Sequence, residues 1–312
     1  MAVKGMLSEL KLPVPWGHIA AKVWGSQQAL PVLCLHGWLD NASSFDRLIP
    51  LLPKDFCYVA MDFGGHGLSS HHSPGLPYYQ ESFVSEIRRV VGALKWKHFS
   101  ILGHSFGGAV GGMFSSIFPE MVNKLILLDT WPFPLDPKGI ECVPTYRRGA
   151  IEHLLQVEAS QKPRQVVSPE EMLQRFMKNN SHVNEESARL LLQRGTTKVA
   201  TGLTLNRDRR IALPEHSMDF VSREQFMNFT KQLQARVLLI KAMQGYFNVR
   251  REDDTNKNII TFVTDTLKLI LKERYQYIQV PGCHYVHLNQ PENVAGIISA
   301  FLQSKETIPH HM

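Results

Sequence analysis

Gly103-His104-Ser105-Phe106-Gly107 is the stretch of this chain that decides its fold, because of what stands on either side of it. The apolar run FSIL at 99–102 is typical of a buried strand, and the small residues GAVGG at 108–112 are typical of a helix packed closely against a sheet. A serine with glycine two residues before and after it fits a sharp strand-to-helix turn, where larger side chains would collide with neighbouring elements. Such a turn lifts the hydroxyl out of the sheet and aims a helix N-terminus at it, which favours the negative charge of acyl transfer.

The composition is that of an ordinary globular protein. The 312 residues are 44% hydrophobic and 20% charged, which suits one large α/β domain with an insertion. No run approaches the roughly 20 apolar residues that a membrane-spanning helix needs, and the first ten residues lack the apolar stretch of a signal peptide. The four cysteines have no metal-type spacing. We therefore expect no transmembrane segment, no bound metal and an intracellular location, in the cytoplasm or associated with an organelle.

The net charge of +6 is spread along the chain. The small basic clusters at 147–148, 207–210 and 250–251 are not interleaved with aromatic residues as a nucleic-acid groove would require. We interpret them as solvated surface rather than as a site for acidic ligands, and we expect no nucleic-acid partner. The sequence leaves open whether the protein is a monomer or a homodimer.

Short apolar runs alternate with helical patterns over most of the chain. Strands are expected at 7–12, 18–24, 32–36, 58–62, 98–102, 124–129, 236–241 and 275–280, and helices at 80–94 and 292–303. This alternation favours an α/β fold with an eight-stranded, mostly parallel sheet covered on both faces. Between 131 and 233 the pattern is only helical, with helix starts at Ser168 and Asn184. We expect this segment to be a cap inserted between the sixth and seventh strands, over the edge where ligands bind, with a core domain of 1–130 and 234–312.

Further features surround Ser105 in the order that an acyl-transfer site needs. A sharp turn after the third strand can aim the backbone N–H of Trp38 at a reacting carbonyl, and the N–H of Phe106 would supply the second oxyanion donor. A serine hydroxyl needs a base within hydrogen-bond reach, and His284, directly after a Pro-Gly turn and the last strand, is the candidate. His287, three residues later, is the alternative that this position disfavours.

The chain resembles the α/β-hydrolase superfamily from Leu7 to Gln303, on the motifs HGWLDNASSF at 36–45, MDFGGHGLSS at 61–70, GHSFGG at 103–108 and GCHYVHLNQPENVA at 282–295. Haloalkane dehalogenases and epoxide hydrolases are capped members of this superfamily, and they have an aspartate at the nucleophile position. Ser105 in its place implies cofactor-free hydrolysis of a small ester-type substrate through an acyl-serine.

The resemblance leaves the acid of the catalytic triad open. The superfamily usually places it shortly after the seventh strand, where this chain has Gly245, and the next acids, at 252–254, lie seven or more residues later. Some capped relatives take the acid from the end of the sixth strand, which implies that Asp129 orients His284. Gly245 also keeps a second function open, a protein of this fold that binds a small ligand or partner without turnover. Lyase or oxygenase chemistry without a cofactor is a third.

The remaining polar motifs are interpreted as structural. Asp62 and the glycines of the loop at 61–70 would build a turn rather than a phosphate cradle. His36 is expected to hold loops together, and His104 to point away from the nucleophile by strand alternation.

Overall fold

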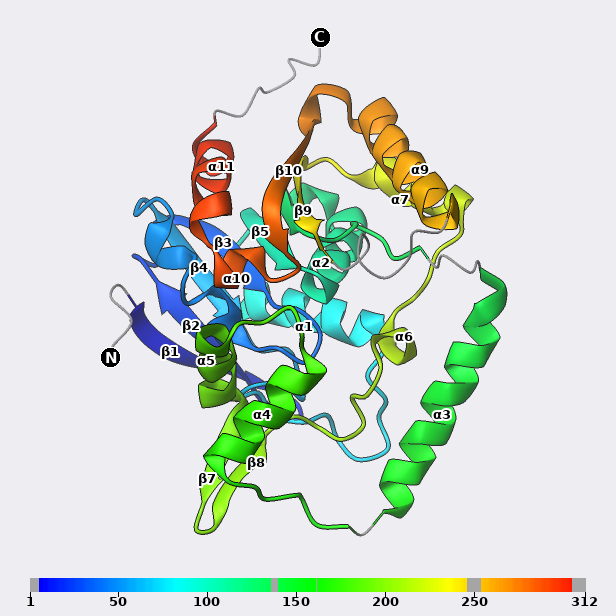
Figure 1. Cartoon of the computed structure of the whole chain (residues 1–312). Helices are drawn as coiled ribbons and strands as arrows, with labels where there is room; N and C mark the ends of the chain where they lie inside the picture. The colour runs from blue at the N-terminus through cyan, green and yellow to red at the C-terminus, as the bar shows by residue number, and fades with distance from the viewer. Residues whose placement is uncertain (1–5, 136–139, 161, 246–253, 305–312) are drawn as a thin grey trace.

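The computed structural model describes residues 6–135, 140–160, 162–245 and 254–304. Eight strands form one sheet in the spatial order β1-β2-β4-β3-β5-β6-β9-β10 (Figure 1). β2 runs antiparallel to both of its neighbours, and the strands from β4 to β10 pair in parallel, so the expected α/β architecture is confirmed. The strands are β1 (Met6–Val14), β2 (Gly17–Trp24), β3 (Leu30–Leu35), β4 (Phe56–Met61), β5 (Phe99–His104), β6 (Val122–Leu128), β9 (Arg236–Gln244) and β10 (Tyr275–Cys283).

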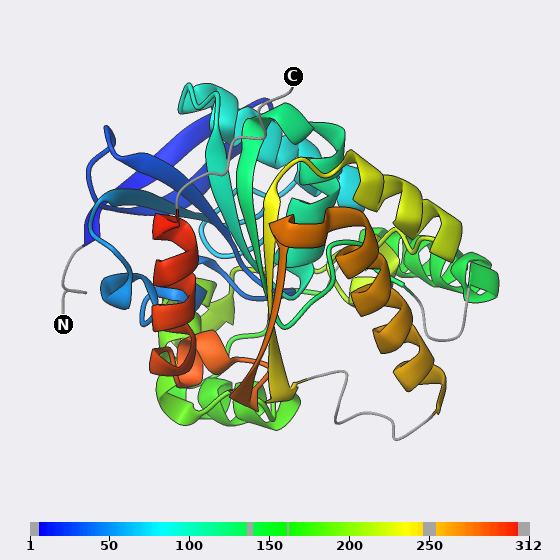
Figure 2. The ribbon, with the colours of Figure 1, turned by 90° about the horizontal axis from the view of Figure 1, so that it is seen from above.

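Helices cover both faces of this sheet, as Figure 2 shows for α9 and α11. One face is covered by α1 (Gln80–Ala93), α2 (Phe106–Ile117), α7 (Arg223–Gln232) and α9 (Asp254–Leu271). The other is covered by α11 (Glu292–Gln303) and the short 3-10 helices η1 (Ala42–Phe45) and η2 (Ile49–Leu51). In α1 the buried Phe83, Ile87 and Val90 recur at helical spacing, which explains why this segment is an amphipathic helix against the sheet.

The segment between β6 and β9, which we call the inserted segment (131–233), is less uniform than expected. It contains α3 (Val143–Ala159), α4 (Pro169–Asn179), α5 (Glu185–Gly195), α6 (Pro214–Ser217) and α7. The helix starts at Ser168 and Asn184 are confirmed, because both side chains accept hydrogen bonds from backbone N–H groups of the first turn. α4 lies beside a second, two-stranded sheet (Figure 1).

That small sheet corrects the expectation of an exclusively helical insertion. β7 (Thr196–Val199) and β8 (Gly202–Leu205) form an antiparallel hairpin. Threonine and valine are favoured in strands because of their branched Cβ, and Gly202 follows the turn with a φ of +155°, which few other residues adopt. Four-residue strands are too short to show a clear period-2 pattern. The helical patterns on either side therefore led to a helical prediction for the whole segment.

The parallel strands bring several polar loops to one edge of the main sheet. The chain leaves β3, β5, β6, β9 and β10 at their carboxyl ends there, which is where open α/β sheets bind ligands. Within the described residues no helix combines the length and the hydropathy needed to cross a bilayer.

Candidate active site

Ser105 lies on a strained turn between β5 and α2. Its backbone has φ +51° and ψ −121°, a conformation that non-glycine residues rarely adopt. The flanking glycines are required by space: a Cβ at Gly103 would lie 2.5 Å from the Cα of Gly108, and one at Gly107 would lie 2.3 Å from the carbonyl oxygen of Leu35. Neighbouring backbone therefore holds the turn tightly, and the serine at its corner is partly exposed.

His284 and Asp129 come together from the ends of β10 and β6. The Nδ1–H of His284 donates to Oδ2 of Asp129 over 2.6 Å. The backbone N–H of Ala242 donates to Oδ1 over 3.1 Å, and the Lys241 ammonium also contacts Oδ1. Burial opposes ionisation of Asp129, but the bond from His284 and the charge of Lys241 outweigh it and lower the pKa of this carboxyl. An ionised Asp129 keeps the proton of His284 on Nδ1 and leaves Nε2 as an acceptor.

Gly245 lies directly against the carboxylate of Asp129. A Cβ at position 245 would be 2.3 Å from Oδ2 and 2.4 Å from Oδ1 of Asp129. The carboxylate that comes from β6 therefore fills the space that a side chain after β9 would need. Of the more distant acids considered above, Glu252 and Asp253 lie outside the described residues, as does the side chain of Asp254.

His104 links the turn at Ser105 to the loop of His284. Its ring Nε2–H donates to the backbone carbonyl of His284 over 3.0 Å, and the two imidazole rings lie 4.6 Å apart. His284 is thus packed against the residue that precedes Ser105. Within the described part of the chain the Ser105 hydroxyl makes no hydrogen bond. His104 is fully buried, and its contact with His284 was not expected.

Two backbone N–H groups have no acceptor among the described protein groups, that of Phe106, which follows Ser105, and that of Trp38, in the turn after β3. Phe106 is the first residue of α2, where backbone N–H groups have no intrahelical acceptor. The Trp38 ring packs edge-on against the Phe106 ring with centroids 4.9 Å apart, and its indole N–H donates to the carbonyl of Ala212 over 3.1 Å. These contacts hold the turn after β3 against the start of α2.

A buried polar cluster beneath these residues was missed by the sequence reasoning. The hydroxyl of Tyr285 donates to Oδ1 of Asp40 over 2.9 Å, and Oδ2 of Asp40 faces Nδ1 of His104 at 3.8 Å. Neither of those facing atoms has a hydrogen-bond partner in the described structure. Burial raises the pKa of Asp40 to about 7 and lowers the pKa of His104 well below its usual value. The signal in the sequence was Asp40 itself, an acidic residue within the motif at 36–45 for which no role had been predicted.

The other histidines of the site have structural contacts. His287 is buried, and its ring forms a hydrogen bond of 2.8 Å with the hydroxyl of Ser44. Burial lowers the pKa of His287 to about 3. A histidine that is so difficult to protonate is poorly suited to act as a general base, so His284 is the better candidate than His287. The Nδ1–H of His36 donates to the carbonyl of Gly37 and its Nε2 accepts from the N–H of Phe63, which confirms the expected loop-holding role.

Asp62 is structural, as expected. Its carboxylate accepts from the backbone N–H groups of Ala42 over 2.7 Å and Leu68 over 2.8 Å. It also accepts from the guanidinium of Arg194, which comes from α5 of the inserted segment. The loop at 61–70 is therefore fastened both to the core and to the insertion.

The basic cluster at 207–210 is only partly the solvated surface that its sequence indicated. Arg210 forms an ion pair of 2.7 Å with the buried Asp208 and donates to three backbone carbonyls, and Arg207 is only partly exposed. Arg147 forms an ion pair with Asp219. The surface interpretation holds for Arg148 and Arg209, which are exposed, and it is wrong for Arg210, whose side chain is largely covered by its contacts. Arg147 and Arg207 are partly exposed, and the cluster at 250–251 lies outside the described residues.

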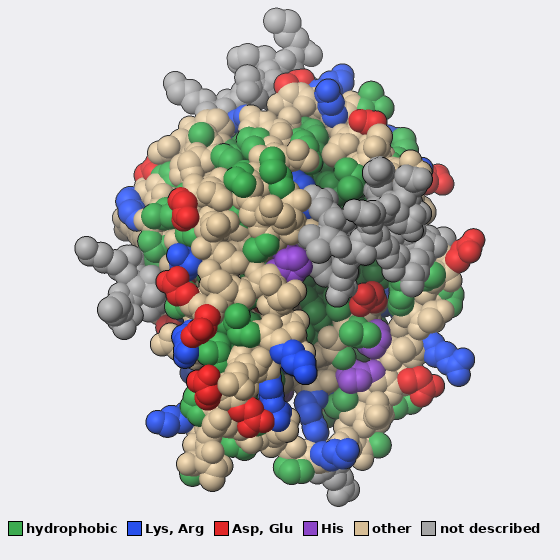
Figure 3. Space-filling model, in the orientation of Figure 1, with side chains coloured by type: hydrophobic (Ala, Val, Ile, Leu, Met, Phe, Trp, Pro, Cys, Tyr) green, Lys and Arg blue, Asp and Glu red, His purple; other side chains and the backbone are tan. Residues whose placement is uncertain are grey.

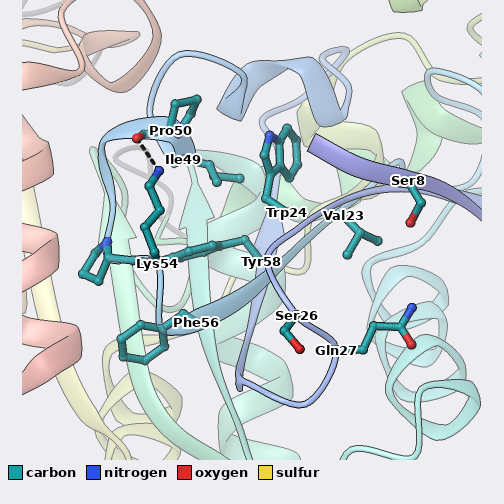
Figure 4. A pocket seen from close by; sticks show the side chains of 12 residues that line it. Ser8, Val23, Trp24, Ser26, Gln27, Ile49, Pro50, Lys54, Phe56 and Tyr58 are labelled. Atoms are coloured by element: carbon teal, nitrogen blue, oxygen red, sulfur yellow. Dashed lines mark hydrogen bonds between the residues drawn. The ribbon is translucent and has the colours of Figure 1, made fainter. Parts of the chain in front are cut away.

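A cavity of 590 Å³ on the opposite edge of the sheet has no comparable chemistry (Figure 4). It lies where β2 ends and β4 begins, beside Trp24, Phe56 and Tyr58. Its charged residue, Lys54, donates to the carbonyl of Pro50. Its described lining contains no histidine, cysteine or carboxylate that could activate a nucleophile.

The comparisons with known proteins agree with the fold. A family model described as the alpha/beta hydrolase fold matches residues 31–203, and the chain belongs to that family. Within it the chain is similar to vertebrate proteins called serine hydrolase-like: it is 66% identical to "Serine hydrolase-like protein" of Mus musculus, over 96% of both chains. It is 65% identical to "Serine hydrolase-like protein 2" of Homo sapiens, over 99% of this chain and 98% of that protein. Among solved structures, a hypothetical protein of Pseudomonas aeruginosa PAO1 covers 96% of this chain and 100% of its own, with 29% identity and a TM-score of 0.81.

Proposed function

We propose that this protein is a serine hydrolase that cleaves a small ester-type substrate through an acyl-serine. In this mechanism Nε2 of His284 takes the proton of the Ser105 hydroxyl as its oxygen attacks the carbonyl carbon. The N–H groups of Trp38 and Phe106 hold the oxyanion, and Asp129 stabilises the imidazolium. His284 then returns the proton to the departing alcohol, and a water activated by the same imidazole releases the acid.

The observation that carries the proposal is the hydrogen bond of 2.6 Å between Nδ1 of His284 and the ionised Asp129. It gives the imidazole the one tautomer that can accept a proton from a serine. The strained turn at Ser105 and the two N–H groups without described acceptors supply the other parts that acyl transfer needs. A carboxylic ester is the preferred substrate class, because its leaving group needs less acid assistance than that of an amide.

We also propose that the inserted segment, 131–233, acts as a cap over this site. Its support is contact between the two parts of the chain: Ala212 accepts the indole N–H of Trp38, and Leu191 of α5 accepts from the side-chain amide of Asn41. Residues of the insertion thus adjoin the turn that would hold the oxyanion. The side chains of the insertion would then select the substrate.

Binding of a small ligand or partner without turnover is the second candidate. Its support was Gly245 at the usual position of the acid, together with the unbonded hydroxyl of Ser105 in this structure. The first argument loses weight because Asp129 occupies the space beside Gly245 and contacts His284. The two candidates differ in whether Ser105 is activated, which can be measured directly.

The test is labelling of the folded protein with a fluorophosphonate, followed by peptide mapping of the modified residue. We expect stoichiometric modification of Ser105, abolished in Ser105→Ala and slowed by about three orders of magnitude or more in His284→Ala. Ser85→Ala, which removes an exposed hydroxyl of α1, is the matched control and should label as the wild type does. A folded wild-type protein that leaves Ser105 unmodified would favour the binding candidate.

A further inference from the structure

A cavity of 990 Å³ lies between the inserted segment and the core. Its described lining comes from α3, α4, α5, β8 and the loops at 162–167 and 207–213, and from residues of the core that include Leu39, Asp40 and His66. This volume is at the upper end of what drug-sized ligands fill. The cavity is therefore large enough for a substrate that extends well beyond the reacting carbonyl.

The described lining of the cavity does not include Ser105 or His284, but it includes residues that contact or adjoin Trp38. Leu39, which lines the cavity, directly follows Trp38, whose N–H is the proposed oxyanion donor. Ala212, which also lines it, accepts the indole N–H of Trp38. The Trp38 ring in turn contacts the Phe106 ring, one residue from Ser105. A group bound in the cavity would thus lie next to a carbonyl positioned for attack.

The described wall of this cavity is strongly basic. Its full charges are the five cations Lys162, Arg164, Arg175, Arg207 and Arg209 and the single carboxyl of Asp40. That carboxyl is buried and bonded to Tyr285, and burial raises its pKa to about 7, so it offsets little of this charge. Figure 3 shows Lys and Arg side chains gathered around a hollow in the lower half of the molecule, between α4 and α3.

Among these cations Arg207 differs in its contacts. Arg175 pairs with Glu171, while Arg164 and Arg209 donate to backbone carbonyls. Lys162 is exposed to solvent. For Arg207 there is no hydrogen-bond or ion-pair partner in the described part of the chain. It is only partly exposed, and burial without a nearby anion lowers its pKa. A desolvated guanidinium of this kind is stabilised when an anion binds it.

We propose that this cavity binds a negatively charged group of the substrate, with Arg207 as its main contact. The substrate class is then an ester or thioester that carries a carboxylate or phosphate-type group on the part of the molecule remote from the reacting carbonyl. This inference rests on the proposed function, because it describes the substrate of the same reaction. Arg207 contributes to binding and specificity here and takes no part in the bond-breaking steps.

The test compares two esters that differ in charge and little in size, mono-p-nitrophenyl glutarate and p-nitrophenyl pentanoate. We expect kcat/KM to favour the anionic ester by about tenfold or more, because a charge-assisted hydrogen bond contributes that much. In Arg207→Gln this ratio should fall toward one, and Arg207→Lys should retain part of it. Arg189→Gln removes an exposed cation of α5 outside the cavity, and it should keep the wild-type ratio.

The design separates failure of this inference from failure of the proposed function. Binding of the two esters to Ser105→Ala, measured by calorimetry, reports the anion site without turnover. If Ser105→Ala binds the glutarate ester more tightly than the pentanoate ester and the wild type hydrolyses neither, the anion site is supported and the proposed hydrolase activity is refuted. If the wild type hydrolyses the neutral ester as well as or better than the anionic one, the anion site is refuted and the proposed hydrolase activity is supported. A third ester, p-nitrophenyl 4-phosphonobutanoate, distinguishes a phosphate-type group from a carboxylate, and preference for either over the pentanoate supports the inference.

Discussion

At the scale of single residues, Asp129 is the group whose position depends most on its surroundings. Its backbone has φ +49°, a left-handed conformation that aspartate tolerates better than most residues. Its backbone N–H donates to the carbonyl of Ile240 over 2.8 Å, which fixes the turn out of β6. Strand endings can be predicted from the sequence, but this conformation and the ion pair with Lys241 depend on β9, more than a hundred residues later.

Asp129→Asn should therefore reduce ester hydrolysis strongly. An amide at this position can donate to Nδ1 of His284 and so favour the tautomer that cannot accept the serine proton. We expect kcat to fall by about 10⁴-fold, as for the corresponding change in other serine hydrolases, with the KM for substrate changed little. Steady-state kinetics with a p-nitrophenyl ester, together with circular dichroism to verify folding, measure this. Retention of more than a tenth of the activity would exclude Asp129 from the triad.

Asp40 should make the stability of the protein dependent on pH. Its pKa is raised by burial from 3.8 to about 7, so the folded state retains a proton that the unfolded state loses. The stability from this proton is fully present below pH 3.8 and disappears as the pH rises through 7. From pH 5 to pH 8 this contribution to the free energy of unfolding falls by about 2–3 kcal/mol.

Asp40→Asn imitates the protonated carboxyl, since it can accept from Tyr285 and present an N–H toward His104. We expect the free energy of unfolding in urea to fall less between pH 5 and pH 8 in this variant than in the wild type, by the amount given above. The comparison of slopes cancels the contributions of other titrating groups. Equal pH dependence in the two proteins would show that Asp40 is ionised in the folded state.

At the scale of elements, the ends of β6 and β9 share one space. Gly245→Ala would place a Cβ 2.3 Å from Oδ2 of Asp129 and push the carboxylate away from His284. Because small misplacements of catalytic groups reduce rates strongly, we expect kcat to fall by about 10²-fold. Gly296→Ala in α11, where a new Cβ meets nothing within 4 Å, is the control and should leave kcat unchanged. Similar kinetics in the two variants would contradict the shared-space argument.

Exchange of the two residues provides a stronger test of the same geometry. Glycine at 129 tolerates the positive φ, and its small size frees the volume beside position 245. In the double variant Asp129→Gly/Gly245→Asp, we expect kcat at least tenfold above that of Asp129→Gly alone, because the carboxylate reaches His284 from β9. Double-mutant kinetics measure this coupling, and purely additive losses would count against it.

The elements differ in how well the sequence predicted them. Buried strands such as β3 and β5 are short apolar runs between turn residues, and α1 has a clear helical period, so local pattern was sufficient. The hairpin of β7 and β8 was missed because its residues are half exposed and its stability comes from contacts with Val167 and α4. Arg207 was predicted to be solvated surface because its position beside core residues results from long-range contacts, which no local sequence pattern shows.

At the scale of the whole molecule, Arg194 fastens the inserted segment to the core. Its guanidinium binds Asp62 after β4 over 2.9 Å and Glu9 of β1 over 2.7 Å, and it is almost fully buried. Arg194→Met leaves Asp62 buried without this cation, so we expect the free energy of unfolding to fall by about 3–5 kcal/mol. Arg189→Met breaks an exposed pair with Glu185 and should change it by less than about 0.5 kcal/mol. Urea denaturation of both variants measures this, and equal losses would refute the fastening role.

Ser105 and Asp129, the proposed nucleophile and acid, directly follow the adjacent strands β5 and β6, and the N–H of Ser105 donates to the carbonyl of Leu128 over 3.1 Å. Their separation is thus set by the hydrogen-bond register of β5 and β6 and by few loop residues. Natural selection for hydrolysis would then act on this register, and relatives with an acid directly after β6 should conserve the ends of β5 and β6 more strictly than relatives with an acid after β9.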